Sequence, residues 1–425
     1  MRRNLPLRFE FIPYPIWRRK MPKVINTLTK PIIQRFYPLA YDETPPPDPA
    51  SMADVLVRYR LLPDMTLTEI HQALLESQAQ IENAYSDVTP DFLSTPEAPA
   101  RIPAQWETME SIIVTWPTIY PPLWDLHSEM VEAIAPVAEA VIIVPGELWA
   151  HAAWVYLMQR GNLGTYQNRV KFLVLPIDDI WVRDYGPIVC LDDAGHQIAF
   201  SAVYDHLPKY PQTRDNAMPW HWAAYMGMPI FSLNLHTEGG NLLSDGTGTL
   251  IMSEQIFRAN PKYNRQTLED YLHTVFQYDK LIITPKLALE HTGHVDLLAK
   301  LANANTVLVS APTSASTAAQ LRANITLFNR ETNAIGEHYT VFELPTPPLY
   351  FNWGAYAIRR SYTNSLIVNG RVLVPIYSLK EDDTALRIYE EAMPDYEIIP
   401  IDCTSGINGG GAVHCMTKEV PAKAN

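Results

Sequence analysis

Residues 111–145, with the sequence SIIVTWPTIYPPLWDLHSEMVEAIAPVAEAVIIVP, contain a helical pattern between two short β-rich runs. The runs SIIVTWP (111–117) and AVIIVP (140–145) are rich in β-branched residues. Each ends at a proline, which cannot donate a backbone hydrogen bond to a sheet. The stretch 121–140 has the residue pattern of a helix. A strand, a helix and a second strand in this order predict an α/β fold.

The same alternation continues along the rest of the chain. Further β-rich runs are KFLVLPI (171–177), TLIMSE (249–254), LIITP (281–285), TVLVSAP (306–312), SLIVNGRVLVPIY (365–377) and YEIIPID (396–402). Further helical patterns cover 265–277, 317–330 and 382–392. The segments GTYQNR and DGTGT lack the spacing of dinucleotide-binding or P-loop motifs. We therefore expect one large α/β domain at residues 101–425, without a nucleotide-binding loop.

Residues 1–100 have a different texture, and we expect them to form a small, mainly helical N-terminal appendage. A basic and aromatic arm occupies 1–40, and Pro-rich linkers occupy 41–52 and 86–104. Thr66 and Glu69 form a capping-box pattern, which predicts a helix from there to about residue 85. We hypothesise that this appendage presents or docks a peptide substrate.

The composition is that of a globular protein with a large core, since 47% of the 425 residues are hydrophobic and 19% are charged. The net charge of the chain is −13, and since residues 1–38 carry nine Lys/Arg and one Glu, a net charge of +8, the remaining body carries −21. An acidic body suits a cationic substrate, although solubility explains the charge equally well, and nucleic acid is not an expected partner. The three cysteines predict no disulfide framework and a reducing, cytoplasmic location. The lack of an 18-residue apolar run predicts no transmembrane helix.

Four motifs place polar residues beside turns. They are IWVRDYGP (180–187), TEGGN (237–241), HTGHVD (291–296) and NGGGAVHCMTKEVP (408–421). The break after Asp184 predicts a carboxylate at a strand end, and the glycines after Glu238 permit an unusual turn and close approach of a ligand. If HTGHVD is extended, His294 and Asp296 lie on the same face.

The last motif holds a cysteine behind a flexible triple-glycine loop. On a strand, His414 would point away from Cys415, and we interpret His414, Cys190 and Cys403 as structural. A thiolate is a strong nucleophile that a nearby imidazolium stabilises, and carboxylates bind the planar N–H fork of a guanidinium. A cysteine, a histidine and several acids together therefore predict attack on the central carbon of a guanidinium.

These segments together resemble the agmatine deiminase and bacterial-type peptidylarginine deiminase family. WVRDYGP, EGGN, GHVD and GGGAVHC occur in this order, and the resemblance runs from about Ile102 to Pro421. It implies a five-bladed, pseudo-symmetric α/β propeller of the pentein superfamily, which modifies guanidines without a metal or organic cofactor. The alternative, a metal site at His291, His294 and Asp296, has no further Cys/His cluster to support it.

The resemblance also implies a role for each matching residue. Cys415 attacks the guanidinium carbon, while His294 protonates the departing ammonia and then activates water. Asp184 and Asp296 hold the guanidinium nitrogens, and Glu238 orients His294 or contacts the substrate. A covalent thiouronium-type intermediate is then hydrolysed to a ureido product.

Three further residues are candidate substrate contacts. Asn364 matches a position that lines the site in the peptidylarginine branch, Trp181 could pack on the aliphatic stem of the substrate, and Arg183 could engage a carboxylate. One regularity accompanies the candidates. The residues Asp184, Glu238, His294, Asn364 and Cys415 follow one another at intervals of 54, 56, 70 and 51 residues. Such spacing fits successive similar units that each deliver polar groups to a shared centre.

The resemblance leaves the substrate open. Agmatine deiminases usually have Asn after His-Val-Asp and Ile-Thr-Gln after the cysteine, whereas this chain has Leu297 and Met416-Thr417-Lys418. We therefore favour arginine in a peptide or protein, which would become citrulline. The alternative is agmatine, which would become N-carbamoylputrescine, or another small guanidino compound. An amidinotransferase and a non-enzymatic binder are two further classes, and the chain could form a homo-oligomer.

Overall fold

The computed structural model describes residues 49–423, apart from residues 60, 63, 92, 119–120, 205–211, 288–289, 291, 313–317, 353–355 and 406–410. The basic arm predicted at 1–40 and two of the three glycines at 409–411 lie outside these described residues. Among the described residues, no helix combines the length and the apolarity that crossing a membrane requires.

The described strands form five sheets of three or four strands and one further two-stranded pair. The first sheet has the order β18 (Thr417–Pro421), β1 (Met109–Thr115), β2 (Glu139–Val144) and β3 (Val170–Val174). The next two are β4 (Ile188–Leu191), β5 (Gln197–Val203), β6 (Ile230–His236), and β7 (Leu243–Ser244), β8 (Thr249–Ser253), β9 (Lys280–Thr284). The last two are β10 (Ala299–Asn303), β11 (Thr306–Ser310), β12 (Thr340–Leu344), and β15 (Leu366–Val368), β16 (Arg371–Ile376), β17 (Glu397–Asp402). The pair is β13 (Tyr350–Asn352) and β14 (Tyr356–Ile358).

One pattern repeats in all five sheets: an antiparallel pair of strands is followed by a parallel neighbour. A parallel neighbour needs a crossover connection, and a helix lies in each of them. These helices are α4 (Trp124–Ile134), α7 (Thr213–Met226), α9 (Arg265–Val275), α10 (Ala318–Arg330) and α11 (Asp382–Ala392). The repeated unit confirms the predicted α/β fold, and five such sheets agree with the expected five-bladed arrangement.

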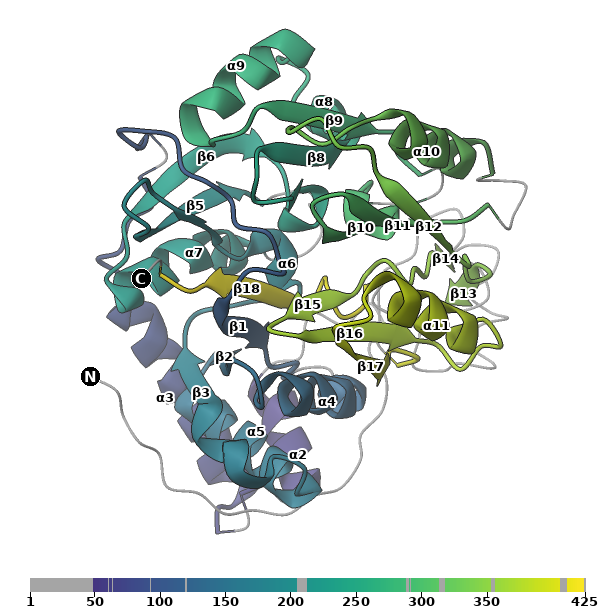
Figure 1. Cartoon of the computed structure of the whole chain (residues 1–425). Coiled ribbons are helices and arrows are strands. Elements are labelled where there is room, and N and C mark those ends of the chain that lie inside the picture. The colour runs from purple at the N-terminus through teal and green to yellow at the C-terminus, as the bar shows by residue number, and fades with distance from the viewer. Residues whose placement is uncertain are drawn as a thin grey trace, which may run out of the picture.

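The first sheet takes its antiparallel strand from the other end of the chain. Ile113 in β1 pairs with Lys418 in β18 on one side and with Val141 in β2 on the other. Figure 1 shows the yellow C-terminal strand beside the dark blue β1. The two ends of the α/β region are therefore joined by hydrogen bonds, and this closure brings the turn before β18 next to segments from the start of the domain.

Most predicted elements are present within a few residues of their predicted bounds, and the exceptions have physical causes. Helix α5 (Glu147–Arg160) and helix α7 were not predicted. Helix α5 is apolar on most of its surface and so lacks a clear polar face, and α7 contains Pro219. The remaining short helices are α6 (Val182–Tyr185), α8 (Gln255–Ala259), η1 (Pro121–Leu123), η2 (Gly164–Arg169), η3 (Gly239–Asn241) and η4 (Val295–Leu297).

The described part of the N-terminal appendage contains two helices, α2 (Pro49–Arg58) and α3 (Leu67–Ala84). Helix α3 confirms the prediction, because the Thr66 and Glu69 side chains cap it reciprocally. The linker predicted at 41–52 is wrong at its end: α2 begins at Pro49, since proline has no N–H to lose in a first helical turn.

These two helices pack on the α/β region. Leu56 and Ile70 are fully buried in the same apolar cluster as strands β1 and β2, and the Tyr59 ring lies 4.7 Å from the Trp124 ring. Figure 1 shows the purple helices against α5. The domain boundary at residue 100 stays a prediction, but the described appendage shares its core with the rest of the chain.

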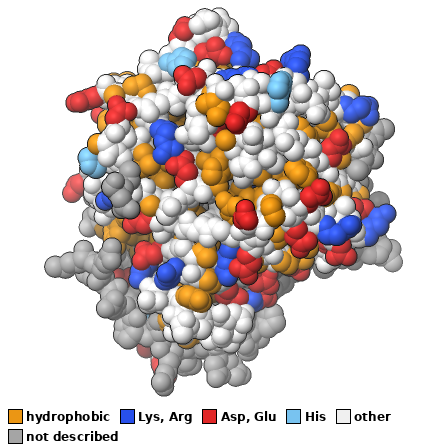
Figure 2. All heavy atoms as spheres, in the orientation of Figure 1, with side chains coloured by type: hydrophobic (Ala, Val, Ile, Leu, Met, Phe, Trp, Pro, Cys, Tyr) orange, Lys and Arg blue, Asp and Glu red, His pale blue; other side chains and the backbone are white. Residues whose placement is uncertain are grey.

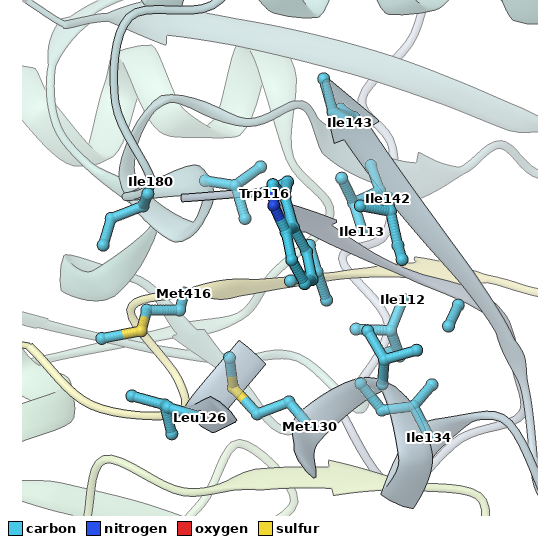
Figure 3. Close-up of a cluster of buried hydrophobic side chains, with 14 of the residues drawn as sticks. Ile112, Ile113, Trp116, Leu126, Met130, Ile134, Ile142, Ile143, Ile180 and Met416 are labelled. Carbon is cyan, nitrogen blue, oxygen red and sulfur yellow. The ribbon is translucent and has the colours of Figure 1, made fainter. Parts of the chain in front are cut away.

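The cluster of buried side chains in Figure 3 explains how two important turns are fixed. Its labelled members from β1, β2 and α4 are Ile112, Ile113, Ile142, Ile143, Leu126, Met130 and Ile134. Met416 and Ile180 lie in the same cluster and are almost completely buried. Burial of such a side chain contributes about 1.5–3 kcal/mol, so each of them anchors the residue beside it, Cys415 and Trp181 respectively.

The surface bears on the predicted steering of a cation. On the face shown in Figure 2, acidic and basic side chains are interspersed, with hydrophobic ones between them. The acidic excess of the chain is therefore not gathered into one patch on this face, and steering by a surface field stays a prediction.

Candidate active site

Five short turns carry the candidate residues, and each turn lies just before the first strand of one sheet. Asp184 lies in α6 before β4, and Glu238 precedes η3 and β7. His294 directly precedes η4, which contains Asp296 and leads to β10. Asn364 precedes β15, and Cys415 precedes β18. Helix α6 contacts both η3 and β18, and η3 contacts η4. The regular spacing seen in the sequence therefore reflects a structural repeat that delivers polar groups to one centre.

Two of these turns differ from the predicted conformation. Asp184 lies in a single helical turn rather than at a strand end, and His294 and Asp296 belong to a 3-10 turn rather than an extended segment. The carboxylates and the imidazole converge all the same. A short helical turn before the strand directs successive side chains at different neighbours, so these side chains converge without an extended segment.

The histidine lies between two acids. His294 Nε2 is 2.9 Å from Glu238 Oε2, and its Nδ1 is 3.5 Å from Asp184 Oδ1. Burial by itself would lower the imidazole pKa, but the negative charges of Asp184, Glu238 and Asp296 outweigh it and raise the pKa to about 10. At neutral pH this group is an imidazolium, so it can donate a proton to a leaving group.

Gly240 shows how closely the acidic groups converge. A Cβ atom at this position would lie 2.6 Å from His294 Nδ1, 2.9 Å from Asp184 Oδ1 and 3.1 Å from Asp296 Oδ2. The backbone N–H of Gly240 donates to Asp184 Oδ1 at 3.2 Å. The glycines after Glu238 therefore serve close approach, as predicted, but the approach is to protein side chains.

On the other side of the centre, an asparagine holds the thiol. Asn364 Nδ2 donates to Cys415 Sγ at 3.2 Å and to Asp296 Oδ2 at 2.9 Å. Its Oδ1 accepts the backbone N–H of Cys415 at 3.3 Å and that of Ala412 at 3.2 Å. One amide thus fixes the turn before β18 and places the sulfur beside a carboxylate, with Cys415 Sγ 3.8 Å from Asp296 Oδ2.

Asp296 has two unequal oxygens. Oδ2 accepts from Asn364 Nδ2 and lies 2.7 Å from His414 Nδ1, whereas Oδ1 is buried and has no hydrogen-bond partner among the described residues. Burial raises the pKa of this carboxyl to about 7, against the opposing charge of His294. An unsatisfied buried carboxylate oxygen is costly, and a donor that fills it would be bound strongly.

The thiol is buried in an acidic environment. Burial raises the pKa of Cys415 well above its ordinary value, and the charges of Asp296 and Asp184 raise it further. The thiolate therefore forms only when a positive charge is placed beside it. A cation bound between these carboxylates and the sulfur would provide that charge.

Trp181 and Arg183 occupy different places. Trp181 packs over the turn before the cysteine, since a Cβ at Gly411 would lie 2.3 Å from its ring and 2.9 Å from Cys415 Cβ. Both Nη atoms of the buried Arg183 donate to the carboxylate of Glu419, one of them at 2.9 Å, and its Nε donates to the backbone oxygen of His414 at 3.2 Å. Because the guanidinium of Arg183 binds a carboxylate of the protein itself, its predicted contact with a carboxylate of the substrate stays a prediction.

Sequence reasoning missed His414 as part of the centre. Residues 413–416 form a turn rather than a strand, so His414 does not point away from the site and its Nδ1 lies 2.7 Å from Asp296 Oδ2. Its Nε2 lies 2.8 Å from Gln105 Nε2. The position next to Cys415 was the available signal, but the assumption of a strand concealed it.

No group of three or more His, Cys, Asp or Glu side chains among the described residues is arranged to hold a metal ion. His291, which belonged to the alternative metal site, lies outside the described residues.

Comparison with known proteins gives the class first. The chain matches the agmatine deiminase of Enterococcus faecalis with a TM-score of 0.69 and 20% identity, over 78% of this chain and 100% of that one. It matches the agmatine deiminase of C. jejuni with a TM-score of 0.68 and 17% identity, over 79% and 100%. At these identities the likeness shows the fold alone, so the class is an α/β protein that shares the fold of these deiminases.

The family follows from the sequence itself. The model of the Porphyromonas-type peptidyl-arginine deiminase family matches residues 101–421, and the chain belongs to this family. It is accordingly a hydrolase that acts on the C–N bonds of amidines. A protein of Marinomonas sp. (strain MWYL1) named "Putative agmatine deiminase" is 26% identical over 354 residues, which are 76% of this chain and 95% of that protein.

Proposed function

We propose that this protein is a cysteine-dependent deiminase that hydrolyses the guanidinium of agmatine to a ureido group and ammonia. The observation that carries the proposal is the buried Oδ1 of Asp296, which has no hydrogen-bond partner among the described residues and belongs to a carboxylate 3.8 Å from Cys415 Sγ. A planar guanidinium offers N–H donors in the geometry that a carboxylate accepts.

The charge balance of the centre also favours a cation. Three carboxylates, those of Asp184, Glu238 and Asp296, surround one imidazolium, that of His294. Buried charges need partners, so this excess of negative charge favours a positively charged ligand. The same ligand charge would offset the repulsion that keeps the Cys415 thiol protonated.

The proposed reaction begins when the guanidinium binds to Asp184 and Asp296 and the thiol loses its proton to solvent. The sulfur of Cys415 forms a bond to the guanidinium carbon, giving a tetrahedral adduct. His294 donates its proton to one nitrogen, the C–N bond breaks, and ammonia leaves a thiouronium-type intermediate. The neutral His294 then takes a proton from water, whose oxygen attacks the same carbon. The C–S bond breaks last, the hydroxyl oxygen becomes the ureido carbonyl, and its proton passes to the departing sulfur, which restores the Cys415 thiol.

The remaining residues position these groups. Glu238 holds His294 through its Nε2 and favours the charged imidazole. Asn364 holds the sulfur and one carboxylate oxygen in register. Trp181 lies beside the cysteine turn, where its ring could pack on the aliphatic stem of the substrate.

The relatives favour agmatine over the peptide substrate inferred from the sequence. The Marinomonas protein, which is matched over 95% of its length, carries an agmatine deiminase name. The peptide preference is not confirmed. It stays as the second candidate, because the family model that covers residues 101–421 is described as a peptidyl-arginine deiminase. Cys415, His294 and Asp296 are each at most 7% exposed, so a substrate must reach them through a slender aliphatic stem, which both agmatine and an arginine side chain have.

The predicted cytoplasmic location is kept as part of the proposal, because all three cysteines are free thiols.

The test is an assay for ammonia and the ureido group with the full chain. It compares agmatine, free arginine, and peptides with internal or C-terminal arginine. We expect agmatine to give the highest kcat/KM, and a higher value for any peptide would replace it by the second candidate. Transfer of the amidino group to an added amine without ammonia would instead indicate an amidinotransferase.

A matched pair of cysteine variants tests the nucleophile. Cys415→Ser is expected to abolish ammonia release while agmatine still binds, as measured by calorimetry. Cys403→Ser, at a fully buried cysteine in the same C-terminal region, is the control and is expected to keep turnover. Unchanged turnover in Cys415→Ser would refute the proposed function.

A further inference from the structure

A chain of hydrogen bonds runs from a buried lysine to the carboxylate beside the thiol. Lys300 Nζ donates to Gln105 Oε1 and, at 2.6 Å, to the backbone oxygen of Ser365. Gln105 Nε2 lies 2.8 Å from His414 Nε2, and His414 Nδ1 lies 2.7 Å from Asp296 Oδ2. The chain therefore links three side chains that the reaction itself does not use to Asp296.

The chemistry of the first link fixes the direction of every other link. Burial lowers the pKa of Lys300 to about 7, and its Nζ donates to two oxygens, the backbone oxygen of Ser365 and Oε1 of Gln105, so the oxygen of the Gln105 amide faces Lys300. The amide nitrogen then faces His414 and donates to its Nε2. A second acceptor, Glu419 Oε2, lies 3.5 Å from the same amide nitrogen and agrees with this orientation.

The tautomer of His414 follows. Because its Nε2 accepts a hydrogen bond from Gln105, the ring carries its hydrogen on Nδ1, which donates to Asp296 Oδ2. Burial lowers the pKa of His414 well below its ordinary value, and the charges of Arg183, Lys300 and Lys418 lower it further, so the ring is neutral. Asp296 Oδ2 is thereby engaged by His414 and Asn364, while Oδ1 has no hydrogen-bond partner among the described residues.

We propose that Lys300, Gln105 and His414 are positioning residues that set the His414 tautomer and thereby hold Asp296 with Oδ1 free to bind the substrate guanidinium. The inference rests on the proposed function for its substrate. Lys300 and His414 are almost completely buried. The residues lie far apart in sequence, and Gln105 and His414 flank the first strand pair of the domain, where β1 and β18 join.

The sharpest test replaces the amide nitrogen of Gln105, in the middle of this series of hydrogen bonds, by an oxygen. In Gln105→Glu the new carboxylate still accepts from Lys300 but has no N–H for His414 Nε2. His414 then lies between two carboxylates, as His294 does, so Nε2 gains a proton and the charged ring pairs with Asp296, which opposes binding of the guanidinium. We expect kcat/KM for agmatine to fall roughly ten- to a hundredfold, as for a lost hydrogen bond to a charged group. The thermal midpoint should change little, because the contact with Lys300 becomes an ion pair.

Two substitutions at His414 separate positioning from packing. An Asn amide nitrogen can stand where Nδ1 stands and can donate to Asp296, whereas Leu fills the space without a donor. We expect His414→Asn to keep kcat/KM within a few-fold and His414→Leu to lose it roughly a hundredfold. Equal losses in both variants, tracking their thermal midpoints, would reduce His414 to a packing role.

The matched control is Gln197→Glu, which makes the same change in another buried amide. Gln197 Nε2 donates to Glu110 Oε2 at 3.0 Å and to the backbone oxygen of Pro421. This variant should lose stability through the like charge near Glu110 but keep kcat/KM per folded molecule. A similar loss of kcat/KM in both Gln→Glu variants would show that the effect is not specific to the chain.

A spectroscopic readout decides the inference without turnover. Ring ¹⁵N shifts of protein labelled only at histidine, with His414 assigned through His414→Asn, report which nitrogen carries the proton. We expect Nδ1–H alone in the wild-type protein and protons on both ring nitrogens in Gln105→Glu. Nε2–H in the wild type would overturn the inference. Absence of any deiminase activity together with Nδ1–H would refute the proposed function and leave the chain of hydrogen bonds standing.

Discussion

The two sides of the candidate active site contrast in their charge, although both face Asp296. On one side, His294 lies between Asp184 and Glu238 and is an imidazolium with a pKa raised to about 10, because the neighbouring negative charges outweigh burial. On the other side, His414 is neutral and Cys415 is a thiol, because burial penalises their charged forms. The same residue type has opposite charge states about one carboxylate.

The charged neighbours of each histidine explain why His294 is charged and His414 is neutral. Burial is the largest influence on both imidazoles, but the further neighbours of His414 are the cations Arg183, Lys300 and Lys418, whereas those of His294 are acids. In the proposed reaction, one side provides the proton donor His294, and the other provides the nucleophile Cys415, which needs a cation beside it to ionise. A guanidinium bound between the two sides would meet both requirements at once.

The largest expected effect comes from removing the charged histidine. His294→Gln keeps a side chain that can bond to Glu238 but cannot transfer a proton. We expect kcat for agmatine to fall about 10²–10⁴-fold with a smaller change in KM, since general acid–base catalysis contributes about that much. Steady-state ammonia release measures it.

The control for this variant is His273→Gln on helix α9, where the side chain is exposed. It is expected to leave kcat unchanged. A His294→Gln enzyme that releases ammonia at the wild-type rate would show that the imidazolium side of the centre takes no part in proton transfer.

The next effect tests whether the two sides must be held close together. In Gly240→Ala the new methyl group would lie 2.6 Å from His294 Nδ1 and 3.1 Å from Asp296 Oδ2, so one of them has to move. A displacement of about 1 Å can cost about a hundredfold in rate, and we expect kcat/KM to fall by that order.

Gly336→Ala is the matched control for Gly240→Ala. Gly336 has a φ of 87° and open space around it, so the substitution should cost about 1–2 kcal/mol of stability through backbone strain and leave kcat/KM alone. If Gly240→Ala kept full activity, the tight convergence of acids around this glycine would be irrelevant to the chemistry.

The sequence predicted the residues of the charged side well, because their chemistry is visible in isolation. Asp184, Glu238 and His294 each stand beside a turn, and a repeated unit carries each turn to one centre whatever its local conformation. Eight β-rich runs and four helical patterns were also visible, but several strands, among them β4, β5, β6 and β12, were not predicted. Helix α7 escaped because Pro219 interrupts its pattern.

The neutral side was harder to predict, because its contacts depend on closure of the fold. Gln105 and Lys300 are ordinary residues in their own segments and meet His414 only after β18 has paired with β1. His414 was placed on a strand by the local pattern, whereas packing of Met416 in the core and the amide of Asn364 hold residues 413–416 in a turn. Such long-range constraints leave no local pattern in the sequence.

A third effect should follow from adding charge to the neutral side. In Asn364→Asp one oxygen can still accept from the backbone of Cys415, but the other replaces the donor that faces Asp296 Oδ2 and Cys415 Sγ. Two carboxylates in contact share a proton, and the added negative charge opposes thiolate formation. We expect kcat/KM at neutral pH to fall about ten- to a hundredfold. Asn369→Asp, in the turn after β15, should cost stability only, and an equal loss of kcat/KM there would contradict the assignment.

The smallest effect concerns the carboxylate that both sides share. The folded-state pKa of Asp296 is raised to about 7 by burial, so this carboxyl is protonated below that pH and cannot accept from a guanidinium. Affinity for agmatine should therefore increase as pH rises through about 7, by about tenfold for each pH unit below it, and level off above it.

Calorimetry with the Cys415→Ser variant measures binding without turnover between pH 5.5 and 8.5. His294 stays charged throughout that window, because its pKa lies near 10, so it contributes no slope of its own. An affinity that does not change across pH 7 would mean that Asp296 is already ionised at lower pH. The cations near His414, which are Arg183, Lys300 and Lys418, would then influence the pKa of Asp296 more strongly than the acids around His294 do.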